Sequence, residues 1–244
     1  VDGNTINVLD TGSITTTGDS AYGINNDGDD NETTVSGSIT TKGVQALGIY
    51  NAGSNNETTV SGSIVTARID AYGIFNDGNA NKANLSGGIA TTGVRGHGIF
   101  SQGSNNETTV SGSIATEGRH ATGIYNDGNN NETNVSGSIT TAGEESHGID
   151  TEGSNNETIV SGSITTTGDG AYGIWNYGSN STTTISGNVK ATGANSVALF
   201  NAFSTSHLSF TLNEGATIIG DVLADDGATN SKLIFNLGSY TSYA

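Results

Sequence analysis

Aliphatic residues recur along this chain with a fixed period of 25 residues. Three such columns run from near the N-terminus to about residue 204, without insertion or deletion, while the residues between them vary. They are Val35, Val60, Leu85, Val110, Val135, Val160 and Ile185; Ile14, Ile39, Ile64, Ile89, Ile114, Ile139, Ile164 and Val189; and Ile24, Ile49, Ile74, Ile99, Ile124, Ile149, Ile174 and Leu199. A disordered spacer has no reason to keep three columns in register, so the pattern predicts a folded repeat protein.

The segments around these columns are typical of short strands. In each unit, T-T-V-S-G, S-I-T-T and A-Y-G-I-Y-N are rich in β-branched or aromatic residues and bounded by Gly or Asn. Nothing recurs at helical spacing. Three strands in 25 residues predict one coil of a parallel β-solenoid, in which each strand stacks ~4.8 Å from its equivalent. We predict an all-β fold with eight coils over residues 1–204, and divergent further coils or a cap over residues 205–244.

A single coil is too small to be stable alone. Three buried aliphatic side chains contribute roughly 2 kcal/mol each, whereas ordering each residue of the backbone costs ~1–2 kcal/mol. Each coil therefore depends on both neighbours. Most glycines also fall in columns, which predicts corners with positive φ or close backbone approach. One inward polar ladder is expected, formed by Asn26, Asn51, Asn76, Asn126, Asn176 and Asn201.

The column after the third aliphatic one is mostly aromatic. Strand parity places it on the face opposite the isoleucines, beside small residues such as Ala46 and Ala71. We predict an outward ladder that can stack sugars, dock another rod or contact a protein; a bulge that turns the rings into the core is the alternative. The candidate ligand-binding residues are Tyr50, Phe75, Phe100, Tyr125, Trp175 and Phe200, and Asn25 and Asp150 complete the column. His97 and His147, three positions earlier, are interpreted as side-chain variation and not as a metal site.

A second outer column is acidic and consists of Glu32, Glu57, Glu107, Glu132 and Glu157. Lys82 and Thr182 interrupt it. Carboxylates ~4.8 Å apart repel by only about 0.9 kcal/mol in water, so a solvated edge tolerates them. We expect this acidic edge to favour solubility. Cation binding between coils is the alternative, but no EF-hand or G-G-x-G-x-D pattern is present, and we predict no metal site and no cofactor.

Composition narrows the classes of function. The 244 residues contain 24 acidic and 7 basic side chains, a net charge of −17, and no Cys, Met or Pro. Disulfide scaffolds and thiolate zinc sites are excluded, and nucleic acid is not an expected partner because phosphate binding needs clustered Lys and Arg. No stretch is long and apolar enough for a membrane span. The start at Val1, with no signal-like segment, leads us to expect a processed or truncated fragment.

Two further patterns bear on function. Each candidate pair of catalytic acids is copied in several coils, whereas catalysis requires one constellation, so we predict that the chain is not an enzyme. The N-x-S/T pattern for glycosylation occurs at several asparagines, and matters only if the source glycosylates asparagine. These are Asn31, Asn56, Asn84, Asn106, Asn131, Asn134, Asn156 and Asn180.

The repeat G-S-I-T-T-x-G-x-x-A-Y-G-I, followed by G-A-T-I-I-G-D-V at 215–222 and N-S-K-L-I-F at 230–235, resembles the passenger domains of Gram-negative autotransporters. The resemblance covers essentially the whole chain. It implies a right-handed parallel β-helix exported to the cell surface or secreted, and the absence of Cys suits a chain that crosses the outer membrane unfolded.

We therefore expect an adhesive or structural rod that binds a host or cell-surface protein, a glycan or other copies of itself. The alternatives are a self-assembling extracellular filament or matrix subunit, and a carbohydrate-binding β-helix.

Overall fold

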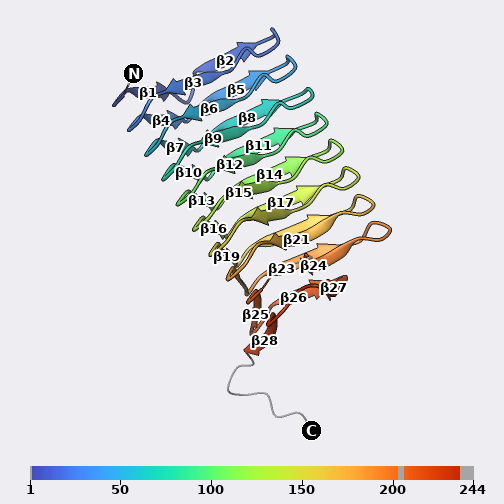
Figure 1. The fold of residues 1–244 in the computed structure, drawn as a ribbon. Coiled ribbons are helices and arrows are strands. Elements are labelled where there is room, and N and C mark those ends of the chain that lie inside the picture. The colour runs from blue at the N-terminus through green and yellow to red at the C-terminus, as the bar shows by residue number, and fades with distance from the viewer. Residues whose placement is uncertain (1, 203–205, 237–244) are drawn as a thin grey trace.

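The computed structural model describes residues 2–202 and 206–236, and within these ranges the chain contains strands and turns but no helix. The strands form three parallel sheets, and each coil contributes one strand to each sheet (Figure 1). The result is a β-solenoid of about nine turns with about 25 residues per turn, which confirms the predicted fold class.

The three sheets are built from equivalent strands of successive coils. Sheet A contains β1 (Thr5–Val8), β4 (Glu32–Val35), β7 (Glu57–Val60), β10 (Lys82–Leu85), β13 (Glu107–Val110), β16 (Glu132–Val135), β19 (Glu157–Val160), β22 (Thr182–Ile185), β25 (Ser209–Asn213) and β28 (Lys232–Asn236). Sheet B contains β2 (Ser13–Thr16), β5 (Ser38–Thr41), β8 (Ser63–Thr66), β11 (Gly88–Thr91), β14 (Ser113–Thr116), β17 (Ser138–Thr141), β20 (Ser163–Thr166), β23 (Asn188–Ala191) and β26 (Thr217–Ile219). Sheet C contains β3 (Ile24–Asp27), β6 (Ile49–Ala52), β9 (Ile74–Asp77), β12 (Ile99–Gln102), β15 (Ile124–Asp127), β18 (Ile149–Glu152), β21 (Tyr172–Tyr177), β24 (Val197–Asn201) and β27 (Asp221–Ala224).

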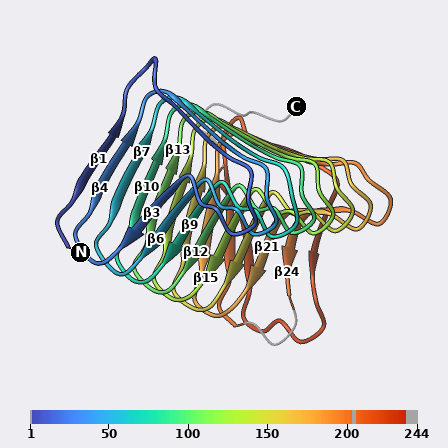
Figure 2. The same ribbon diagram turned by 90° about the horizontal axis from the view of Figure 1, so that it is seen from above.

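The aliphatic columns form the core of the rod. Residues 25 apart pair in register, as in Ile89 with Ile114 of sheet B and Ile99 with Ile124 of sheet C. These side chains are at most 2% exposed. Figure 2 shows the coils one behind another with nearly the same outline, and the loops between sheet B and sheet C project side by side along one margin.

Two different causes keep glycine in its columns. At Gly53 the backbone has φ +117°, in the region that favours glycine. At Gly98 a Cβ would lie 2.4 Å from Ile114 Cγ2 and 2.5 Å from the Gly123 carbonyl oxygen, so close approach excludes a side chain. Several left-handed positions are occupied by non-glycine residues, such as His120 and Glu145 in the projecting loops, where the equivalent residue of a later coil is Gly170.

The predicted asparagine ladder lies inside the rod. Asn26 Nδ2 donates to Asn51 Oδ1 at 2.7 Å, and Asn51 Nδ2 donates to Asn76 Oδ1 at 2.7 Å. Each of the first two amides also donates across the core to a threonine seven residues later, such as Thr33 at 2.8 Å. Asn126, Asn176 and Asn201 are also buried, and Ser101 and Thr151 interrupt the column.

A second asparagine ladder was not expected from the sequence. It consists of Asn31, Asn56, Asn81, Asn106, Asn131 and Asn156, each at most 3% exposed. The backbone N–H of each of the first five donates to the side-chain Oδ1 of the next, at 2.7–2.9 Å, and that of Asn156 donates to Ser181 Oγ at 3.0 Å. The N-x-T matches at five of these asparagines therefore reflect a structural ladder whose amides are not open to modification in the folded rod.

The tail from Ser206 to Asn236 continues the solenoid. Strands β25 and β28 extend sheet A, β26 extends sheet B and β27 extends sheet C. Phe210 and Leu212 of β25 are still buried, whereas the apolar side chains of β27 and β28 are more exposed than those of the repeats, with Leu223 at 46% and Phe235 at 62%. The predicted boundary at residues 204–205 and the end of the tail, residues 237–244, lie outside the described residues.

Candidate functional site

The six aromatic residues proposed as a ladder lie on the outer face of sheet C. Along each strand the ring lies between two buried residues, an isoleucine or leucine before it and an asparagine or serine after it, so no bulge turns these six rings into the core. Each ring is half-buried and not fully exposed. Phe75 and Phe100 stack with centroids 4.7 Å apart and an angle of 8° between their planes, and Phe100 and Tyr125 do so at 4.8 Å and 12°. The ladder therefore follows the spacing of the strands.

A second row of side chains covers this ladder. Its members lie three positions before each ladder residue, in the loops before the strands of sheet C or, for the last two, at the first residue of β21 and β24. They are Tyr22, Leu47, Tyr72, His97, Thr122, His147, Tyr172 and Val197. Rings of this row contact the ladder ring 28 residues later, as in Tyr72 with Phe100 at 5.5 Å and Tyr172 with Phe200 at 4.9 Å. The two rows together form one aromatic surface, which explains why the ladder is only half exposed.

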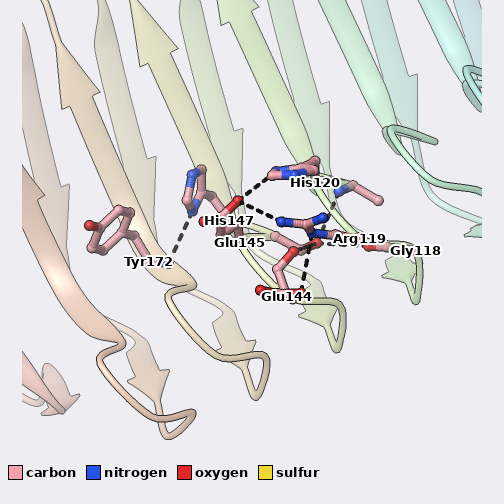
Figure 3. A network of polar contacts seen from close by, with 9 residues as sticks. Gly118, Arg119, His120, Glu144, Glu145, His147 and Tyr172 are labelled. Carbon is pink, nitrogen blue, oxygen red and sulfur yellow. Dashed lines mark hydrogen bonds and ion pairs between the residues drawn. The ribbon is translucent and has the colours of Figure 1, made fainter.

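His97 and His147 belong to this second row, a role that the sequence analysis missed. His97 packs 5.4 Å from Tyr125, and His147 packs 4.7 Å from Trp175. His97 Nδ1 accepts the backbone N–H of Thr122 at 3.0 Å. His147 Nδ1 accepts the backbone N–H of Tyr172 at 3.1 Å (Figure 3). Burial lowers the pKa of His97 to about 4 and that of His147 to about 3, so both rings are neutral at neutral pH.

The aromatic surface is interrupted once between its two halves. One half runs from Tyr22 to Tyr125 and the other from His147 to Phe200. Between them, Thr122 replaces a ring of the second row and Asp150 replaces a ring of the ladder. A hollow of about 440 Å³ opens there, lined by Arg95, His97, His120, Thr122, Tyr125, Glu145, His147 and Asp150.

Charged residues of the projecting loops form the rim of this hollow. Arg119 pairs with Glu144 at 3.2 Å, and Glu145 lies 3.1 Å from His120 Nδ1 (Figure 3). Arg95 donates to both carboxylate oxygens of Asp70, at 2.6 and 2.8 Å. All three pairs are at the surface, so each stabilises the fold only slightly.

The predicted acidic edge lies on the outer face of sheet A. Register places Glu107 beside Glu132, and Glu132 beside Glu157. Lys82 breaks the column and its Nζ lies 3.0 Å from Glu107 Oε2. Within the described ranges, no group of three or more His, Asp or Glu side chains is arranged to hold a metal ion.

In residues 2–202 and 206–236 there is no helix that could span a membrane. No protein-family model, curated protein or solved structure matches this chain.

Proposed function

We propose that this chain is a rigid, non-catalytic rod that acts as an adhesive or structural segment at the cell surface or in secreted form. The observation that carries this proposal is the strict register of the coils, which places similar outer side chains, such as Phe75, Phe100 and Tyr125, at successive strand spacings. A partner that contacts several coils gains affinity from many weak, equivalent contacts. The resemblance of the repeat to autotransporter passengers supports the location.

The geometry of the ladder favours a protein partner over a sugar. Stacked rings such as Phe75 and Phe100 cover one another's faces, so their edges point away from the rod. A sugar packs against the open face of a ring, whereas the side chains of a protein can pack against a row of ring edges. The small residues predicted beside the ladder, such as Ala46 and Ala71, are fully buried and offer no contact surface. Along most of its length, the surface therefore fits a protein strand or loop.

Self-association is a second candidate function, because the last described strands carry exposed apolar side chains. Ile219, Leu223 and Phe235 are 48, 46 and 62% exposed. Exposed apolar residues on edge strands promote pairing between chains. Concentration-dependent fibres in size-exclusion chromatography and electron microscopy would support this filament and argue against a monomeric rod.

The adhesive proposal predicts graded loss of binding. The chain is tested against arrays of extracellular-matrix proteins and glycans, and then Phe75→Ser, Phe100→Ser and the double variant are compared on the protein that binds. We expect each ring to weaken binding about equally, with roughly tenfold loss for the double variant, because equivalent coils add their contacts.

The control removes charge on the outer face of sheet A, away from the ladder, with Glu107→Gln and Glu132→Gln, which should leave binding unchanged. Circular dichroism verifies that each variant keeps its fold. Complete loss after one ladder substitution, or loss only in the control, contradicts a repeated adhesive surface. Binding to glycans alone contradicts the choice of a protein partner.

A further inference from the structure

The interruption of the aromatic surface is built as a distinct site. Elsewhere, a side chain of the second row contacts the ladder ring 28 residues later, as His97 contacts Tyr125 and His147 contacts Trp175. The pair formed by Thr122 and Asp150 is the one between these two, and both of its members are short and polar. Since both rows lose a ring at the same place, the hollow reaches down to sheet C.

The size of the gap fits one flat group. Asp150 pairs in register with Tyr125 on one side and Trp175 on the other, so these two ladder positions are two strand spacings apart, ~9.6 Å. Stacked rings in the same ladder take 4.7–4.8 Å each. One face of Tyr125 is covered by Phe100, and the other is directed toward the gap. The gap therefore has the thickness of one planar group stacked on Tyr125.

The floor of the hollow carries a carboxylate without a partner. Asp150 is only 9% exposed, yet its side chain makes no hydrogen bond or ion pair with any residue in the described parts of the chain. By contrast, Asp77 of the same sheet accepts the Tyr50 hydroxyl at 2.9 Å, and Asp70 is paired with Arg95. An unpaired buried carboxylate is unfavourable, and a cation bound in the hollow would relieve that cost.

The residues around Asp150 favour a planar organic cation over a metal ion. Metal binding is disfavoured, because the described residues offer no suitable group of ligands and Nδ1 of both His97 and His147 is already used by a backbone N–H. Burial, followed by the neighbouring carboxylates of Glu152 and Asp127, raises the pKa of Asp150. The negative charge of these neighbours favours a positively charged ligand, and such a ligand would hold Asp150 in its ionised form. A planar cation can use both the ring face and the carboxylate.

We propose that this hollow binds a guanidinium group, presented by an arginine side chain of a partner protein. The guanidinium plane stacks on Tyr125, and two of its N–H groups donate to the two oxygens of Asp150. A lysine ammonium is compact and lacks the flat face, so it fits the gap less well. This site goes beyond the proposed rod function, because it occurs in one coil and not in every coil. Its binding can be tested with a small molecule, independently of the adhesion experiments.

The experiment titrates the whole chain with N-acetyl-arginine amide, and follows it by ¹H–¹⁵N NMR. We expect saturable shifts confined to the coils around Thr122 and Asp150, and at least tenfold weaker binding of N-acetyl-lysine amide and of the neutral analogue N-acetyl-citrulline amide. A Gly-Gly-Arg-Gly-Gly peptide should bind at least as tightly as the amide. Weaker binding of the peptide contradicts an arginine within a protein, and equal binding of citrulline contradicts the charge recognition.

Two variants and a matched control assign the binding to this hollow. Asp150→Asn keeps the shape and removes the charge, and should weaken arginine binding at least tenfold without loss of fold. Thr122→Phe should abolish binding by filling the hollow with a ring. Asp77→Asn, which changes the carboxylate that Tyr50 already engages, should leave affinity unchanged. Unchanged affinity in Asp150→Asn overturns the proposal, whatever the outcome of the adhesion experiments.

Discussion

One substitution in the inner column of sheet C and one in its outer column have different consequences. Inside, Ser101 replaces an asparagine of the buried ladder. Its own Oγ, Asn76 Nδ2 and Thr108 Oγ1 then have no hydrogen-bond partner in the described structure. Outside, Asp150 replaces an aromatic ring, and the result is a hollow with a carboxylate at its floor.

The difference lies in access to water and ligands. An unpaired polar group in the core costs about 1–3 kcal/mol and has nothing to recover that cost. On the outer face, the same kind of departure creates a place that a ligand can occupy. The repeat therefore keeps its interior nearly constant, and the outer columns are where one coil can acquire a function of its own.

The largest expected effect comes from a substitution at Gly87, where the backbones of neighbouring coils lie too close together for a side chain. A Cβ at Gly87 would lie 1.9 Å from the Gly62 carbonyl oxygen, whereas at the adjacent Gly88 the nearest atom, Ser113 Oγ, is 3.5 Å away. Gly87→Ala should lower the free energy of unfolding by roughly 3 kcal/mol, as overpacking against backbone does. Gly88→Ala should be neutral or stabilising by up to about 1 kcal/mol. Thermal unfolding of the two variants measures this, and equal melting temperatures contradict the rigid spacing.

The next effect concerns the outer face, where the buried histidines make stability depend on pH. Their pKa values fall from 6.5 to about 4 at His97 and about 3 at His147, so the unfolded chain binds more protons than the folded chain in that interval. The contribution of the neutral histidines is complete well above pH 6.5 and is lost as the pH falls toward 3–4, by roughly 3 kcal/mol for His97 and roughly 5 kcal/mol for His147. Asp150 acts in the opposite direction, because its raised pKa makes the folded state bind a proton more readily.

Denaturant unfolding between pH 7 and pH 4 measures this dependence. His97→Phe and His147→Phe should each reduce the loss of unfolding free energy as the pH falls. Both variants keep a ring in the second row, although each loses the acceptor for one backbone N–H. The exposed His120 serves as control, and His120→Gln should keep the slope of the parent protein. An unchanged slope in the two phenylalanine variants means that these rings are not buried as described.

Much of this architecture could be predicted from the sequence, because stacking requires equivalent residues at one period. The three sheets, the Asn26–Asn51–Asn76 ladder and the outward direction of Phe75 and Phe100 follow from the period and from strand parity. The role of His147 does not follow, because a loop of irregular conformation brings it against Trp175. Recurrent rings at 22, 72, 97, 147 and 172 were the available signal. The second asparagine ladder, from Asn31 to Asn156, was not predicted, because most of its asparagines also match the N-x-S/T glycosylation pattern.

The smallest expected effect comes from restoring the asparagine that the buried ladder lacks at Ser101. Ser101→Asn restores the buried ladder by giving Asn76 Nδ2 an acceptor and by donating to Thr108 Oγ1, as Asn51 does to Thr58 at 2.9 Å. We expect a gain of about 1 kcal/mol in unfolding free energy, the net value of one or two buried hydrogen bonds. Thr151→Asn is the matched control, since only Thr151 Oγ1 lacks a partner there and Asn126 already donates to Thr133, so its gain should be smaller. If Ser101→Asn destabilises the rod, the interior of this coil is adapted to serine. The contrast between Ser101, as a substitution that costs stability, and Asp150, as one that creates a binding site, then fails.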